Sequence, residues 1–191
     1  MFATHARPVA AQAATASHTL TDLTGRPRVG VRGADSRGYL QAHGFTLPER
    51  PNQATSQGDA CLVAALSQTE FLVLAGEQET GDRVASLEAS WELSSQANYL
   101  LPRQDSHAWL MLRGPRSGEV MAKVCAVDLR PQCFEVGCVA QTSVARVNAI
   151  VIHGQIGGEP AYHLLFDRCS LAYMEGALCD ALEEFNGTAK A

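Results

Sequence analysis

Apolar residues repeat along this chain with two different periods. Short, largely apolar runs predict strands, which we place at residues 61–66, 70–74, 143–153 and 161–166. Spacings of three and four residues predict helices over residues 82–91 and 167–185. Asp167 or Ser170 is suited to cap the start of the second helix. We expect residues 154–160 to form the hairpin loop between the last two strands.

The two halves of the chain resemble each other in the order of these elements. Residues 29–39 align with residues 110–120, so that Arg32-Gly33 and Arg113-Gly114 fall at equivalent places. Each half continues with two apolar runs and a helix, which predicts the order β-α-β-β-α twice. Two such units, each unable to bury its sheet face alone, would pack as one pseudo-symmetric α+β domain. A chance likeness between two strand-glycine-helix units is the alternative.

The pattern predicts one folded domain with short extensions at both ends. Its expected parts are an N-terminal arm (residues 1–19), a single domain (20–187) with half-repeats at about 20–93 and 107–187, and a C-terminal tail (188–191). The alanine-rich arm has too few strongly apolar residues for a signal peptide, and no run of 18 apolar residues suits a membrane span. We therefore expect a cytoplasmic protein that makes no membrane contact.

Charge narrows the possible partners further. The net charge is −5, which disfavours nucleic acid and anionic membranes, because both require a clustered positive field. Only Lys123 and Lys190 are lysines among the fifteen basic residues. Arginine suits protein interfaces because its planar group pairs bidentately, although the codon bias of a GC-rich genome is an equally good explanation.

The residue types that perform chemistry form no recognisable set. The six cysteines include no CxxC pair, so we expect reduced thiols and no metal, and only Cys133 and Cys138 merit a check as a metal or disulfide pair. The turns at Gly33 and Gly114 match no phosphate-binding pattern, which favours a packing role. Histidines such as His163 stand alone among apolar residues, as structural histidines do. We therefore expect no catalytic, cofactor-binding or metal-binding residue in this chain.

Two polar residues interrupt the apolar run at residues 143–153. In one continuous strand Arg146 and Asn148 would share a face with Val144 and Ile150, while Val147 and its alternate neighbours would form a smooth apolar face. A charge on a buried face requires a partner. That partner of Arg146 would be Asp128 within the chain, or an acidic group on another subunit. Arg146→Ala would lower the melting temperature in the first case and prevent assembly in the second.

One block carries a resemblance to a known family. Cys125-Ala-Val-Asp-Leu-Arg-Pro131, Phe134, Gly137 and the run from Ala140 to Ile150 resemble the gamma subunit of heterotetrameric sarcosine oxidase. Weaker matches extend the resemblance over roughly residues 20–186. It implies a fold similar to the folate-binding domain of the glycine-cleavage T-protein (aminomethyltransferase) family, which is a duplicated α+β unit.

The resemblance also implies a function. The family's complex of alpha, beta, gamma and delta subunits oxidatively demethylates sarcosine to glycine. FAD, FMN, NAD and tetrahydrofolate are held by partner subunits, zinc belongs to the delta subunit, and the gamma chain serves assembly without a cofactor. The resemblance therefore implies a non-catalytic subunit of an oxidoreductase. The candidate structural or interface residues are Asp128, Arg130, Gln141, Arg146 and Asn148.

A free-standing folate-binding, one-carbon-transfer protein on the same fold is the alternative. The run Gly137-Cys138-Val-Ala-Gln141 is faintly similar to the lysine-glycine-cysteine-tyrosine motif of folate-binding relatives. Its lysine and tyrosine are missing here, so that activity is not carried over to this chain.

Overall fold

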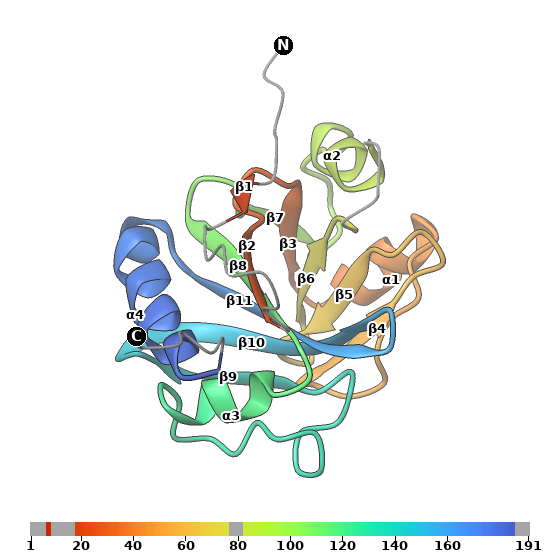
Figure 1. Ribbon diagram of the computed structural model, residues 1–191. Coiled ribbons are helices and arrows are strands. Elements are labelled where there is room, and N and C mark those ends of the chain that lie inside the picture. The colour runs from red at the N-terminus through yellow and green to blue at the C-terminus, as the bar shows by residue number, and fades with distance from the viewer. Residues whose placement is uncertain (1–6, 9–17, 77–81, 186–191) are drawn as a thin grey trace. The chain divides into compact units, whose positions relative to one another are not determined.

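The computed structural model describes residues 7–8, 18–76 and 82–185, and its class is α+β (Figure 1). The described residues form two antiparallel sheets, four α-helices and one short 3-10 helix. These described residues divide into two compact units, one within the ranges 1–25 and 107–191 and the other within the range 26–106. The expected α+β class is therefore confirmed. None of the described helices is both long enough and apolar enough to cross a bilayer.

The first unit contains a six-stranded sheet. Its strands, in spatial order, are β1 (Arg7–Pro8), β2 (Thr19–Asp22), β8 (His107–Arg113), β11 (Glu159–Asp167), β10 (Val147–Ile156) and β9 (Val139–Val144). Its helices are α3 (Ser117–Ala122), the 3-10 helix η1 (Arg168–Ser170) and α4 (Leu171–Glu183). The buried stripe of α4, which includes Met174, Leu178 and Leu182, belongs to the same core as Leu110 and Leu164 of the sheet.

The start of the closing helix agrees with the sequence prediction. The Asp167 carboxylate accepts a hydrogen bond from the Cys169 N–H at 3.0 Å, whereas the Ser170 side chain makes no capping bond. Of the two predicted caps, Asp167 is the one that makes a capping bond, and it caps the 3-10 helix η1 that leads directly into α4.

The second unit contains a five-stranded sheet. Its strands, in spatial order, are β4 (Gln53–Ser56), β5 (Leu62–Ala65), β6 (Glu70–Leu74), β3 (Arg28–Arg32) and β7 (Tyr99–Pro102). Its helices are α1 (Ser36–Ala42) and α2 (Asp82–Ala89). Val84 and Leu87 of α2 join Leu40 of α1 and Phe71 of β6 in one buried cluster.

The predicted single strand over residues 143–153 is wrong. β9 ends at Val144, Ala145 and Arg146 form a two-residue turn, and β10 returns from Val147 in antiparallel register with Val144 opposite Val147. Ala145 and Arg146 have φ values of 46° and 68°, the left-handed pair that a tight hairpin requires. Val144 and Val147 consequently lie on the same face, whereas an unbroken strand would place them on opposite faces.

Other strands also differ from the prediction. The hairpin loop expected at residues 154–160 is only Gly157–Gly158, because β10 and β11 continue in register up to the pair Ile156 and Glu159. Strands β2, β4 and β7 were not predicted. Each half therefore has the order β-α-β-β-β-α, one strand more than expected, from β3 to α2 and from β8 to α4.

Strand pairing also sets unit boundaries that differ from the expected half-repeats. β2 precedes the first run of elements in the chain but pairs with β8, and β7 precedes the second run but pairs with β3. The first half-repeat was expected to begin at residue 20, whereas the second unit begins at Arg26. That residues 20–187 form a single domain stays a prediction. Most of the expected arm and all of the tail (188–191) lie outside the described residues.

Candidate functional site

Two of the five candidate residues, Asp128 and Arg130, lie between α3 and β9. We call this stretch, residues 123–138, the α3–β9 segment. Its backbone is irregular, yet Leu129 and Phe134 are buried in the core of the first unit. The Tyr162 hydroxyl of β11 donates to the Leu129 carbonyl at 2.5 Å. The Nδ1 of His153 in β10 lies 2.5 Å from the Phe134 carbonyl, which assigns the proton to Nδ1. Two strands of the sheet therefore hold this segment through buried side chains.

A stack of three rings reinforces this attachment. The His153 ring is nearly parallel to the Tyr162 ring, and their centroids are 4.7 Å apart. It is also nearly parallel to the Phe134 ring, at a centroid distance of 6.1 Å. The backbone adds a Gly137 N–H bond to the His153 carbonyl and a His153 N–H bond to the Cys138 carbonyl. His153 and Tyr162 were missed as site residues, because the sequence does not show which loop a strand residue will contact.

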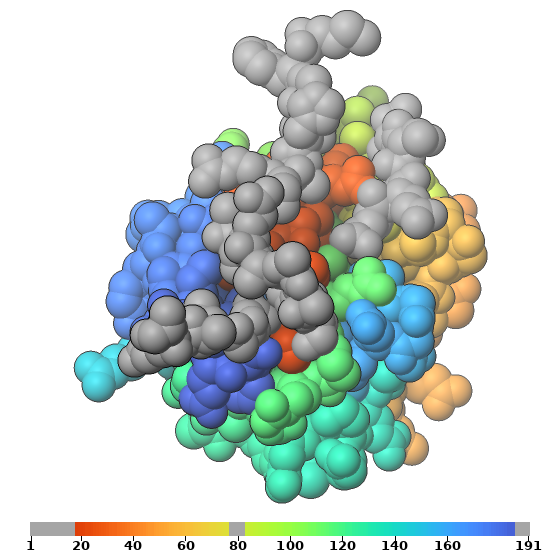
Figure 2. Space-filling view, in the orientation of Figure 1, coloured from red at the N-terminus to blue at the C-terminus, as the bar shows by residue number. Residues whose placement is uncertain are grey.

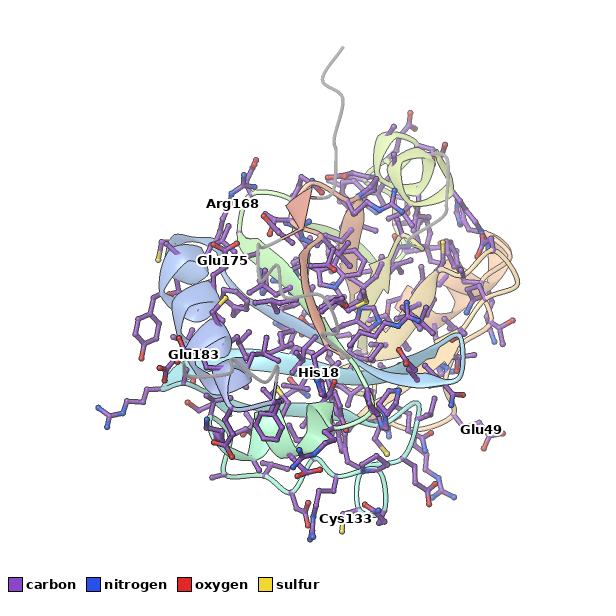
Figure 3. All side chains as sticks on the ribbon, in the orientation of Figure 1. His18, Glu49, Cys133, Arg168, Glu175 and Glu183 are labelled. Atoms are coloured by element: carbon purple, nitrogen blue, oxygen red, sulfur yellow. The ribbon has the colours of Figure 1, made fainter. Side chains whose placement is uncertain are left out.

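Asp128 and Arg130 form an ion pair within the α3–β9 segment. Asp128 Oδ2 lies 2.6 Å from Arg130 Nη2, and its Oδ1 accepts from Arg130 Nε at 2.9 Å. These side-chain hydrogen bonds hold the pKa of Asp128 well below its usual value and raise that of Arg130. Hydrogen bonding to Asp128 also raises the pKa of the Cys133 thiol. Figure 3 shows Cys133 on the outer side of this segment, pointing away from the sheet.

Arg146 does not occupy the environment expected for it. It lies exposed at the tip of the β9–β10 hairpin, so its charge is not buried on a sheet face. Asp128 pairs with Arg130, and the predicted internal pair between Asp128 and Arg146 is therefore wrong. Next to Arg146, the Ala145 carbonyl accepts a hydrogen bond from the Tyr173 hydroxyl of α4 at 3.0 Å.

Gln141 and Asn148 lie on neighbouring strands and share a face. Gln141 is opposite Ile150, and Asn148 is opposite Ser143. Both candidates are exposed, whereas Val144, Ala149 and Val151 on the other face are buried in the core. The alternation predicted for residues 147–151 is confirmed, and the polar pair lies on the face of β9 and β10 that points away from that core.

His163 is a buried structural histidine, as the sequence predicts. The Trp109 Nε1–H donates to His163 Nδ1 at 3.2 Å. Burial lowers the pKa of His163 to about 4, so the ring is neutral at physiological pH. In the part of the chain that the structure describes, no three His, Cys, Asp or Glu side chains are grouped as a metal site requires.

The two glycine turns share a geometry that explains their glycines. Gly33 and Gly114 have φ values of 138° and 144°. A Cβ on Gly33 would lie 2.0 Å from the Ala97 carbonyl oxygen, so no other residue fits there. The N–H of Gly33 donates to the Thr69 carbonyl, and that of Gly114 to the Pro160 carbonyl. Because these donors are already used, the geometry agrees with the predicted packing role.

Comparison with known proteins identifies solved structures with a similar fold. No protein-family model matches the chain, and no curated protein matches it by sequence. A chain in the solved structure of heterotetrameric sarcosine oxidase from Corynebacterium sp. U-96, in complex with pyrrole 2-carboxylate, superposes with a TM-score of 0.73 at 24% identity. The match covers 93% of this chain and 90% of that chain. The two chains share a fold.

A second solved structure confirms the predicted likeness to the T-protein. The glycine cleavage system aminomethyltransferase T from Bartonella henselae matches with a TM-score of 0.59 at 13% identity. The match covers 86% of this chain but only 45% of the aminomethyltransferase, so this chain corresponds to less than half of that protein. The predicted resemblance is therefore confirmed at the level of the fold.

Proposed function

We propose that this chain is the gamma-type, non-catalytic subunit of a sarcosine oxidase-type complex that oxidatively demethylates sarcosine to glycine. One observation carries the proposal: the likeness to a chain of a heterotetrameric sarcosine oxidase extends over 93% of this chain and 90% of the other. A correspondence between two whole chains favours a shared position in an assembly over a domain reused in an unrelated protein. The chain would work in the cytoplasm and support assembly of the complex.

In this proposal the partners are the alpha, beta and delta subunits. FAD, FMN, NAD and tetrahydrofolate would be bound by those subunits, and this chain would contribute surface. Asp128, Arg130, Gln141, Arg146 and Asn148 are its proposed interface residues. All five are exposed, as an interface with another subunit requires.

A one-carbon-transfer function is the second candidate, and the likeness to aminomethyltransferase T favours it. That likeness is weaker, with a TM-score of 0.59 against 0.73, and includes less than half of the aminomethyltransferase. The missing lysine and tyrosine beside Gly137-Cys138 also argue against a folate site of the kind that the sequence suggested. The assembly role is therefore the better supported of the two.

We also infer that the two units arose by duplication. In both, a strand ends at an arginine, a glycine follows directly, and a helix begins three residues after the glycine. The Ser36 hydroxyl donates to the Gly33 carbonyl at 2.7 Å, and the Ser117 hydroxyl donates to the Gly114 carbonyl at 2.8 Å. Apart from β1 at one edge of the six-stranded sheet, the two sheets also follow the same order, β7-β3-β6-β5-β4 and β2-β8-β11-β10-β9. Matching turns and strand orders support the pseudo-symmetric duplication that the sequence suggested.

Co-expression tests the assembly role. The tagged chain is produced together with alpha, beta and delta chains from the same genome, and the purified material is analysed by size-exclusion chromatography and mass spectrometry. We expect one particle that contains all four chains and forms glycine from sarcosine. A parallel expression without this chain should yield less complex and less activity.

Calorimetry with tetrahydrofolate separates the two candidate functions. The isolated chain should bind no tetrahydrofolate, and it should not demethylate any N-methyl amino acid. Micromolar binding by the isolated chain, together with failure to co-purify with the flavoprotein chains, would replace the assembly role with the one-carbon-transfer role.

A further inference from the structure

The α3–β9 segment holds apolar side chains on its outer side as well as on its inner side. Leu129 and Phe134 are buried, whereas Val127 is 39% exposed and Val136 is 56% exposed. Large apolar side chains exposed in this way are unfavourable in water, and a partner surface that covers them gains their burial. In Figure 2 the residues that follow α3 form part of the molecular surface at the lower edge of the view.

We propose that the outer side of the α3–β9 segment, formed by Val127, Arg130 and Val136, is a docking surface for a non-identical protein chain. The inference rests on the proposed function and deepens it, because it identifies which surface of this chain meets another subunit. The expected occupant is a folded protein surface that offers apolar side chains around a hydrogen-bond acceptor.

The structure holds this surface in place before any partner arrives. The Tyr162 hydroxyl and the His153 ring bond to the backbone at Leu129 and Phe134, and their rings stack 4.7 Å apart. The Phe134 N–H also donates to the Arg130 carbonyl at 2.9 Å, which closes one turn of backbone between the two attachment points. An irregular segment held at adjacent points loses little conformational entropy on binding, and this favours tight association.

Charge on the segment identifies the chemistry of the partner. Asp128 and Glu135 are acidic and Lys123 and Arg130 are basic, so the α3–β9 segment carries no excess of positive charge to attract an anionic polymer or membrane. Asp128 engages Nε and Nη2 of Arg130, and the Arg130 side chain is still 60% exposed. A guanidinium that Asp128 already orients, in a segment that also exposes two valines, suits a carbonyl or carboxylate oxygen on an apolar protein surface.

The fold comparison favours a non-identical chain over a second copy. The matching solved chain comes from a heterotetrameric enzyme, in which a subunit of this fold is accompanied by other chains. Docking of a second copy is an alternative outcome that the experiment below separates.

A double substitution tests the docking surface in the co-expressed complex. Val127→Asp with Val136→Asp places two charges where the partner would cover apolar carbons. Leu93→Asp is the matched control, because Leu93 is 74% exposed and lies in the other unit. Mass photometry over a dilution series gives the concentration at which each complex dissociates. We expect the double variant to dissociate at a concentration at least about tenfold higher than the wild type, and the control to behave as the wild type.

A second measurement uses the wild-type chain and does not depend on how the variant folds. Cys133 is exposed within the segment, so a maleimide can reach it in the isolated chain, and its labelling rate there is the reference value. In the assembled complex we expect the labelling rate of Cys133 to fall at least about tenfold, because a protein surface covers it.

The outcomes separate the two proposals. Failure of the wild-type chain to assemble with alpha, beta and delta chains would contradict the proposed function itself. Assembly with an unchanged dissociation concentration in the double variant, or an unchanged labelling rate at Cys133, would overturn only the docking surface. A homodimer weakened by the double substitution would show that a second copy occupies the surface, and this would also overturn the inference.

Discussion

Burial of His163 should make the stability of the fold depend on pH. The ring accepts a hydrogen bond from Trp109, and burial lowers its pKa from 6.5 to about 4. When the pH falls below 6.5, the unfolded chain therefore binds a proton that the folded chain does not. The free energy of unfolding should decrease by about 1.4 kcal/mol for each pH unit between these two pKa values. The full effect is about 3 kcal/mol.

The variant His163→Asn isolates this effect. The Asn carbonyl oxygen can accept the bond from Trp109, and an amide does not titrate. We expect the wild type to lose about 2.5 kcal/mol more stability than the variant when the pH is lowered from about 7 to about 4.5. Urea unfolding, followed by tryptophan fluorescence at several pH values, measures this difference.

His43→Gln is the matched control for His163→Asn, because His43 is exposed at the end of α1. This control shows whether the loss of any histidine changes the dependence of the unfolding free energy on pH. Parallel stability curves for the wild type and His163→Asn over this pH range would refute the reasoning from burial.

Three further substitutions test the packing of the first unit by urea unfolding. Tyr162→Phe removes the buried bond to the Leu129 carbonyl and should cost about 1–3 kcal/mol. Because burial raises the pKa of Tyr162 from 10 to about 12, the wild type should also lose stability as pH rises through this range, and the variant should lose less. Arg146→Gly relieves a left-handed residue with φ 68° and should stabilise the fold by about 1 kcal/mol. Leu178→Ala leaves a cavity in the core and should cost about 2–5 kcal/mol.

Each of these substitutions has an outcome that would contradict its premise. A Tyr162→Phe protein as stable as the wild type would mean that the segment is not held through that hydroxyl. Destabilisation by Arg146→Gly would show that the arginine side chain contributes to the isolated fold. A cost well below about 1 kcal/mol for Leu178→Ala, the size seen for exposed positions, would contradict its placement in the core.

Local patterns in the sequence determined the elements that have a strong period and a clear end. The stripe of α4, the cap at Asp167 and the strands predicted at residues 61–66, 70–74 and 161–166 follow from spacing and residue type alone, although the last strand extends beyond its predicted ends. The glycines at positions 33 and 114 also marked their turns, because the φ values there suit only glycine. These features depend on neighbours within a few residues, so the chain encodes them locally.

Tertiary structure alone decided the hairpin at Ala145-Arg146 and the pairing of the short strands. Val-Ala-Arg-Val contains no glycine, asparagine or proline, so a continuous strand is what its local pattern favours. Pairing of β10 with both β9 and β11 places Val144 and Val147 on the core side, and their burial stabilises the strained turn. β2 and β7 become strands by pairing with β8 and β3, which are far away in sequence. Likewise, His153 contacts the α3–β9 segment only once the sheet has folded. Contacts of this kind depend on which segments meet in space, and the local order of residues does not contain that information.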